Sequence, residues 1–231
     1  MSRAIACQGQ LLDALFVLAE VCESQVSPAI ADELIKCYAI WLKMMSPERA
    51  QSQLEQIALA IEIDGNEANA EELTLRNGTR VSLPVAIVVL HRQVLQGEGT
   101  WLIPLLQGTD LASSEQYAEA LIKLKHAHQL RPDNSLIANN LAWTTLQLHS
   151  GGHQAEPLAP QVQAELENAW ELANSAVTRH PDEPAFRETR GQLAGHLKRW
   201  VEAVDDLSEC VTMGHNSPAI QATLKRAGMS L

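Results

Sequence analysis

The chain has 231 residues, of which 46% are hydrophobic and 19% are charged, so it carries enough apolar side chains to fold. Its 28 acidic and 17 basic side chains give a net charge of -11. A negative field of this size repels nucleic-acid phosphates and anionic lipids. We therefore expect neither nucleic acid nor a membrane surface as the partner.

The N-terminal segment carries no mark of export. Its apolar stretch is broken by Asp13 and Glu20, and no small-residue cleavage site follows, so we expect no signal peptide. The longest uncharged apolar run, residues 81–90, is about half the length of a membrane-spanning helix. The cysteines have neither the spacing of a zinc site nor the density of a secreted disulfide scaffold: Cys7, Cys22, Cys37 and Cys210. A soluble protein of the reducing cytoplasm is expected.

Residues 1–83 are expected to form an irregular helical region. Two serine-proline pairs each place a capping hydroxyl before a proline at the first helical position, which predicts helices over residues 28–45 and 47–63. An earlier helix is expected over residues 10–23. Because Gly9 to Leu18 also echoes the start of a repeat helix, degenerate repeats are an alternative for this region.

A polar segment, residues 64–82, separates this region from the rest of the chain. Asp64-Gly65-Asn66 and Asn77-Gly78 are turn signals, and the only strand-like alternation is a short segment around residues 79–83. Beyond it, helical patterns predict helices over residues 84–95, 101–111, 115–130, 135–149 and 160–177, a hairpin over 184–213 and a terminal helix over 218–227.

One helical pattern recurs three times in this C-terminal part. The distances from Gly108 to Ala142 and from Ala169 to Ala203 are both 34 residues, a period typical of stacked helix-turn-helix units. The recurring positions, unit by unit, are Gly108, Tyr117, Ala120, Ala127 and Pro132; Ala142, Leu166, Ala169, Ala176 and Pro181; and Gly191, Trp200, Ala203, Cys210 and His215.

An insertion interrupts the second unit. The step from Pro132 to Pro181 is 49 residues, which exceeds the 34-residue period by 15. The extra residues lie around Gly151-Gly152, and Pro160 can begin the helix that follows. The expected array therefore covers residues 84–231, with units at 101–134, 135–183 and 184–217 and a C-terminal cap helix.

Each recurring residue type has a physical role. Small residues at Gly108, Ala142 and Gly191 let the first helix of a unit approach the second closely, with Ala120, Ala169 and Ala203 on the reciprocal surface. Larger groups at Tyr117, Leu166 and Trp200 are expected to pack against the next unit. Pro132 and Pro181 end the second helix because proline cannot continue its hydrogen-bond ladder.

These residues resemble the tetratricopeptide repeat family over residues 101–217. The resemblance rests on YAEAL and AHQLRPDN in the first unit, IANNLAW with LENAWELANSAVTRHPDE in the second, and FRETRGQLAGHLKRWVEAVDDLSEC in the third. Pro104 and His215 depart from the pattern. The resemblance implies an all-α, right-handed α-solenoid preceded by the less regular N-terminal helices.

It also implies a function. Arrays of this family bind peptides or partner helices in a concave groove lined by the first helix of each unit. Carried onto this chain, the groove residues are Asn139, Trp143 and Leu146 in the second unit, and Glu188, Gln192 and His196 in the third. Asn140 is expected to be structural, bonding to the next hairpin, and Arg190 to form a structural salt bridge. The clamp that some members use for C-terminal carboxylates is not recognisable.

Catalytic and metal-binding patterns are weak. His126 and His128 lie two apart on a helix and face different ways, and a Gly-Gly break separates His149 from His153. The adjacent carboxylates Glu71-Glu72 and Asp205-Asp206 are expected on solvated segments, without a buried partner to shift their pKa values. We expect no enzyme activity, no cofactor and no metal.

The resulting interpretation is a noncatalytic protein–protein interaction module, an adaptor or assembly scaffold. Its partner is expected to be another protein or peptide, and Trp143 would be a natural hot spot for binding. Two alternatives remain open: a self-associating module that forms a homodimer through its N-terminal helices, and an accessory subunit of an enzyme.

Overall fold

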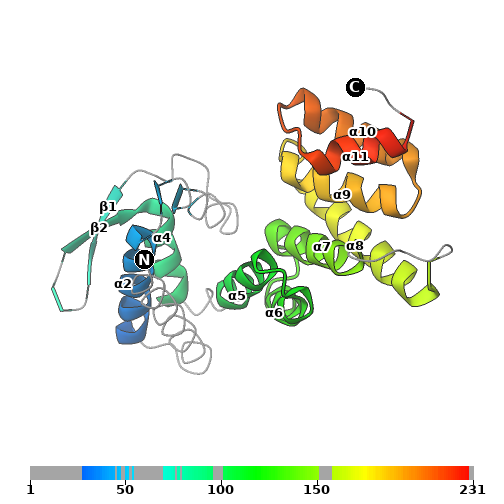
Figure 1. Cartoon of the computed structure of the whole chain (residues 1–231). Coiled ribbons are helices and arrows are strands. Elements are labelled where there is room, and N and C mark those ends of the chain that lie inside the picture. Colours follow the sequence, from blue (N-terminus) through cyan, green and yellow to red (C-terminus); the bar gives the residue numbers. More distant parts are fainter. Residues whose placement is uncertain are drawn as a thin grey trace. The chain divides into compact units, whose positions relative to one another are not determined.

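The computed structural model describes residues 28–44, 46–47, 50–51, 54, 70–75, 77–78, 80–95, 101–150 and 158–228 (Figure 1). These residues are mostly helical and fall into two compact units, Met1–Gln107 and Gly108–Leu231. The division lies inside a helix, further along the chain than the boundary expected at residues 83–84. Most of the helix expected over 47–63, the helix expected over 10–23, and the repeat echo near Gly9 lie outside the described residues.

The described residues of unit 1 form α2 (Pro28–Met44), the strands β1 (Ala70–Thr74) and β2 (Arg80–Pro84), α4 (Val85–Leu95) and the first part of the helix that follows. The antiparallel strands pair Ala70 with Pro84 and Thr74 with Arg80. Gly78 lies in the connecting turn with φ 81°, a conformation that costs glycine little. Within the region expected to be irregular and helical, residues 70–74 and 80–84 therefore form strands, and the alternation around residues 79–83 did indicate the second of them.

The core of unit 1 lies between α2, α4 and the sheet. Ala31 and Ile35 of α2 and Ile87 and Val88 of α4 are all fully buried, and α4 contacts both strands. A buried polar pair crosses the same interface, where His91 Nε2 lies 2.8 Å from Asp32 Oδ1. On the sheet, Glu71 binds Arg92 of α4 at 2.6 Å, so this carboxylate has a partner.

The helices expected in the C-terminal part are confirmed, with bounds that shift by a few residues: α5 (Leu102–Ser113), α6 (Tyr117–Leu130), α7 (Ser135–Ser150), α8 (Pro160–Arg179), α9 (Pro184–His196), α10 (Trp200–Thr212) and α11 (Pro218–Arg226). The division between the two units falls within α5. Pro132 and Pro181 follow the ends of α6 and α8. Pro184 and Pro218 stand at the first helical position of α9 and α11, where their missing N–H costs nothing.

Consecutive helices of unit 2 pack against one another. α7 pairs with α8 and α9 with α10, while α6 contacts α7, α8 contacts α9, and α9 also contacts α7. α11 packs on α9 and α10 (Figure 1). Its buried side chains, Ile220, Thr223 and Leu224, lie on one side, and the remaining described positions are mostly exposed. The exposed side of α11 carries three polar and three small apolar residues and no large hydrophobic one: Gln221, Lys225, Arg226, Pro218, Ala219 and Ala222.

Small residues stand where the helices of a pair approach most closely. A Cβ atom at Gly108 would lie 2.5 Å from Leu124 Cγ, and one at Gly191 would lie 2.8 Å from Leu207 Cγ. Ala142 is fully buried in a cluster with Leu166, Ala169 and Leu193. Side chains at these three positions cannot be enlarged without moving a neighbouring helix.

Candidate protein-binding face

The first part of the candidate site is the face of α7 that carries Asn139 and Trp143. The two residues are one helical turn apart, so their side chains lie on the same face. Trp143 is 37% exposed, whereas Asn139 is 6% exposed and its Oδ1 atom has no hydrogen-bond partner. The exposed indole offers an apolar surface, whereas the unpaired amide oxygen is a hydrogen-bond acceptor that lies buried within the same face.

Trp143 is held in place by the preceding helix. Its ring meets the ring of Tyr117 on α6 edge to face, with centroids 6.2 Å apart and an interplanar angle of 76°. This geometry is favourable for aromatic pairs. The contact limits the freedom of the indole, so less conformational entropy is lost when a ligand binds to its exposed part.

Leu146 does not belong to this face. It is 3% exposed and packs with Ala142, Leu166 and Ala173 in the core between α7 and α8. The helical period places Leu146 on the edge of the apolar stripe, and the long α8 covers that edge. Its expected place in the groove is therefore corrected to a place in the core.

Glu188 of α9 is occupied by its own chain. His215 Nε2 lies 2.6 Å from Glu188 Oε2, and Ser217 donates its hydroxyl to Glu188 Oε1 at 2.5 Å. Ser217 is also the N-cap of α11, accepting from the Ile220 amide. Glu188 thus positions the start of α11, and His215, which departs from the repeat pattern, supplies one of the contacts.

Gln192 is partly paired. It is 9% exposed, and its Oε1 accepts a hydrogen bond of 2.7 Å from Thr223 of α11. Its Nε2 atom is buried without a partner. Gln192 therefore offers an unpaired donor on α9, while Asn139 offers an unpaired acceptor on α7.

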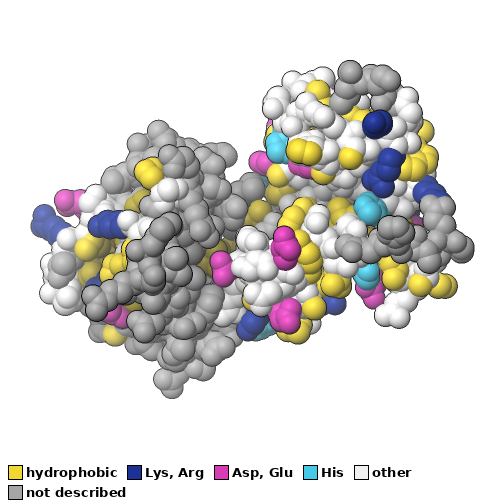
Figure 2. Space-filling view, viewed as in Figure 1, with side chains coloured by type: hydrophobic (Ala, Val, Ile, Leu, Met, Phe, Trp, Pro, Cys, Tyr) yellow, Lys and Arg dark blue, Asp and Glu magenta, His cyan; other side chains and the backbone are white. Residues whose placement is uncertain are grey.

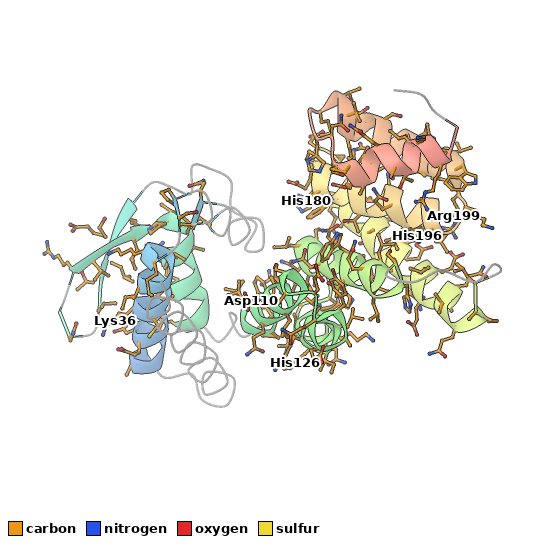
Figure 3. The ribbon with its side chains drawn as sticks, in the orientation of Figure 1. Lys36, Asp110, His126, His180, His196 and Arg199 are labelled. Atoms are coloured by element: carbon orange, nitrogen blue, oxygen red, sulfur yellow. The ribbon has the colours of Figure 1, made fainter. Side chains whose placement is uncertain are left out.

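His196 is the last residue of α9 and is labelled in Figure 3. Its Nε2 atom is 3.5 Å from the Ser150 hydroxyl at the end of α7. Burial lowers the pKa of His196 below its ordinary value of 6.5, and the positive charge of Arg226 lowers it further. The imidazole is therefore neutral at pH 7 and does not by itself attract an anion.

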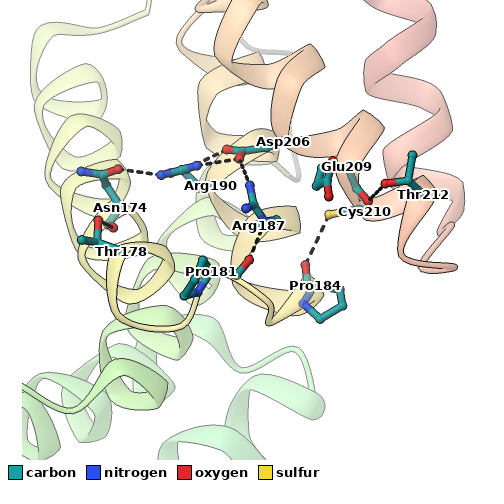
Figure 4. Close-up of polar contacts among 10 residues, drawn as sticks. All are labelled: Asn174, Thr178, Pro181, Pro184, Arg187, Arg190, Asp206, Glu209, Cys210 and Thr212. Carbon is teal, nitrogen blue, oxygen red and sulfur yellow. Dashed lines mark hydrogen bonds and ion pairs between the residues drawn. The ribbon is translucent and has the colours of Figure 1, made fainter.

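A buried charge network joins α8, α9 and α10 next to this face (Figure 4). Arg190 donates to both carboxylate oxygens of Asp206, at 2.7 and 2.6 Å, and to Asn174 Oδ1 at 2.7 Å. Arg187 adds a contact of 3.4 Å to Asp206. The hydrogen bonds to Asp206 raise the pKa of Arg190. The structural role expected of Arg190 is confirmed, but Asp206 is 3% exposed and not solvated as expected.

Two further polar contacts differ from the expectations drawn from the sequence: the contacts of Arg199 were not expected, and Asn140 was expected to bond elsewhere. Arg199 lies over the ring of Trp170, 4.5 Å from its centroid, and also pairs with Glu167 of α8. Asn140 donates to the Thr109 hydroxyl at 3.1 Å. It therefore bonds to the preceding helix α5 and not to the next hairpin.

Cys210 and His149 each have a partner within the described part of the chain. Burial raises the pKa of Cys210 to about 12, and its thiol donates to the Pro184 carbonyl at 3.4 Å (Figure 4). His149 pairs with Glu165 at 2.7 Å, while His153 lies outside the described residues. Among those residues, no three His, Cys, Asp or Glu side chains are grouped to hold a metal ion.

None of the helices described above combines the length and the apolar character needed to cross a bilayer. The most apolar of them, α4, has 11 residues, about half of what a span requires.

Comparison with known proteins leaves the chain without an assigned relative. No protein-family model matches it, and no curated protein matches it. The resemblance to tetratricopeptide repeats therefore rests on the residues of the sequence itself.

Proposed function

We propose that the chain is a noncatalytic protein-binding module, an adaptor or assembly scaffold, that binds an extended peptide on the face shared by α7 and α9. The carrying observation is the exposed Trp143, which lies on the same face of α7 as Asn139, together with two buried amide atoms that have no partner, Asn139 Oδ1 on α7 and Gln192 Nε2 on α9. Native proteins rarely leave buried polar atoms without partners. A ligand that supplies both partners would satisfy these two atoms.

The proposed architecture is a right-handed solenoid of tetratricopeptide-like units. Three observations support it: the 34-residue spacing of small residues, the close approach at Gly108 and Gly191, and the packing of each helix on its sequence neighbours from α6 to α10. In such a stack, the first helices of successive units line one side. α7 and α9 are those first helices, so Asn139 and Gln192 would lie along the same trough.

The chemistry of the face suits a peptide backbone. Both amide atoms are buried, so a peptide reaches them only when neighbouring side chains move aside; Asn139 Oδ1 then accepts from a peptide N–H, and Gln192 Nε2 donates to a peptide C=O. A backbone bound in this way is recognised through its main chain, and pockets or rings beside it select the side chains. Trp143 supplies an aromatic surface for one apolar side chain of the ligand.

Affinity capture from a cell extract tests the proposal. Trp143→Ala and Asn139→Ala variants are compared with Ile122→Ala, which removes an apolar side chain that is 68% exposed on α6. We expect the first two variants to lose a partner that wild type and Ile122→Ala retain, by about tenfold or more for Trp143. If both variants keep every partner of the wild type at unchanged affinity, binding on this face is wrong.

Self-association is a second candidate because α2 exposes apolar side chains. Ile40 is 51% exposed and Met44 is 38% exposed, and the two lie one turn apart on the same face. Sedimentation of wild type and Ile40→Glu over a wide concentration range tests this candidate. A dimer that the substitution dissociates would support it, and a wild type that stays monomeric would exclude it.

A further inference from the structure

A row of three unlike side chains crosses α7, α9 and α11. Gln192 follows Trp143 by 49 residues, the 34-residue period plus the 15-residue insertion, and Arg226 follows Gln192 by 34. α11 itself begins one period after α9, since Pro184 and Pro218 both stand at the first helical position. Trp143, Gln192 and Arg226 therefore occupy the same position of successive first helices.

Two hydrogen bonds connect Gln192 and Arg226 through the hydroxyl of Thr223. Arg226 donates to the Thr223 hydroxyl at 3.1 Å, and that hydroxyl donates to Gln192 Oε1 at 2.7 Å. A Cβ atom at Gly195 would lie 2.7 Å from Thr223 Cγ2, so α11 packs tightly on this part of α9. Burial lowers the pKa of His196, and the positive charge of Arg226 lowers it further.

Arg226 differs from the arginines that hold unit 2 together. Arg187 and Arg190 contact Asp206, and Arg199 contacts Glu167. Arg226 is exposed and donates only to a hydroxyl; it pairs with no carboxylate of the described chain. In a protein with a net charge of -11, Lys225 and Arg226 form a local excess of positive charge. Figure 2 shows Lys and Arg side chains gathered over α9 to α11.

We propose that the bound peptide carries an apolar side chain that contacts Trp143 and an acidic side chain that pairs with Arg226. This inference rests on the proposed function of the α7–α9 face. Packed helices lie about 8–10 Å apart, so the two steps from α7 to α11 span about 16–20 Å. An extended chain rises about 3.3 Å per residue. The apolar and acidic residues of the ligand are thus about five or six positions apart.

Binding of labelled synthetic peptides, followed by fluorescence polarisation, tests this spacing. Each probe is a ten-residue peptide of Ser, Thr and Gln with one Leu or Phe, and with one Glu placed two to eight positions away in either direction. We expect the tightest binding at a separation of five or six in one direction. Replacing that Glu with Gln should weaken binding by about threefold to tenfold at low salt, and the difference should shrink at high salt.

Two variants test whether the preference for the Glu peptide depends on the charge of Arg226. Arg226→Gln should bind the Glu and Gln peptides equally, whereas Lys225→Gln removes a neighbouring charge from the same helix and should keep the preference for Glu. Thermal unfolding of both variants shows whether α11 remains folded. The exposed Arg226 also favours a helix C-terminus by charge alone, and that role would change stability without changing the choice of peptide.

The outcomes separate the two proposals. If Trp143→Ala weakens peptide binding but the position of Glu has no effect, the acidic contact is wrong and the peptide-binding face stands. If Arg226→Gln keeps the preference for Glu, the contact is also wrong. If no peptide of the set binds the wild type, the acidic contact is overturned, and the capture experiment alone then decides the function of the face.

Discussion

On the face shared by α7 and α9, the polar side chains of the two helices differ in how far their hydrogen-bonding atoms have partners. On α9, Glu188 is bound by Ser217, and Gln192 accepts from Thr223 of the following helix. On α7, Asn139 Oδ1 at the corresponding position receives nothing, and Trp143 stays half-exposed. The same repeat position is therefore structural in one unit and unpaired in the other.

The reason lies in the helix that follows each one. Glu183 and Thr189 of α9 stand 34 residues before Ser217 and Thr223 of α11. Thr189 donates to the Ala185 carbonyl of its own helix, and Glu183 caps the Ala185 amide. Neither reaches α7. The comparison teaches that α9 and α11 satisfy polar groups by hydrogen-bonding to each other, whereas Asn139 Oδ1 of α7 has no partner among the described residues.

Loss of the charge network around Asp206 should have the largest effect on stability, because the network holds α9 against α8 and α10. Asp206→Ala leaves Arg190 and Arg187 without their carboxylate, and we expect unfolding free energy to fall by about 3 kcal/mol. Urea denaturation measures this loss. Asp205→Ala is the matched control, since its exposed carboxylate should contribute less than about 0.5 kcal/mol. Equal effects at the two positions would contradict the network.

Removal of the N-cap of α11 should weaken only the packing of α11 on α9. Ser217→Ala deletes both the N-cap of α11 and the hydroxyl bound to Glu188, and it should cost about 1 kcal/mol. Hydrogen exchange should become faster in α11, with α7 unchanged. Exchange that accelerates equally in α7 and α11 would show that the two regions are not independent.

Acid should destabilise the protein through His196. Because its pKa in the folded state lies below 6.5, the unfolded state binds more protons between the two values. Stability contributed by the neutral imidazole is present above pH 6.5 and is lost as the pH falls toward the folded-state pKa. Denaturation from pH 7.5 to 5.0 should therefore show a steeper loss for wild type than for His196→Gln. Parallel curves would contradict the burial of this histidine.

The smallest change in stability is expected at Asn139 of α7, whose amide oxygen has no partner. Asn139→Leu replaces a buried amide whose oxygen has no partner, so the unfolding free energy should stay within about 1 kcal/mol of wild type or rise. Peptide binding should nevertheless be lost. A strong destabilisation in thermal or urea unfolding would show that Asn139 supports the fold and is not kept for a ligand.

Local chemistry made much of the fold predictable. Serine before proline, or proline alone, located the starts of α2, α8, α9 and α11, and the period of small residues located the close approaches at Gly108 and Gly191. The strand β1 was not predictable, because its sequence AEELT has weak strand propensity and it forms by pairing with β2.

The candidate site was predictable only in part, since helical periodicity defines a stripe but not its edges. Trp143 was placed on an exposed face, whereas Leu146 proved to be covered by α8. Adjacent residues such as Asp205 and Asp206 point about 100° apart on a helix, and only packing decides which is buried. Arg226 was not among the expected groove residues, because its position in the row appears only when α11 is aligned with α9.

Photo-crosslinking from the face itself tests the central claim most directly. A benzoylphenylalanine at position 143 reports any partner that approaches Trp143, and the same group at position 122 is the control on α6. We predict a partner crosslink from position 143 that is absent from position 122 and that Asn139→Leu abolishes. Crosslinks of equal yield from both positions, or from position 122 alone, would contradict binding on the α7–α9 face.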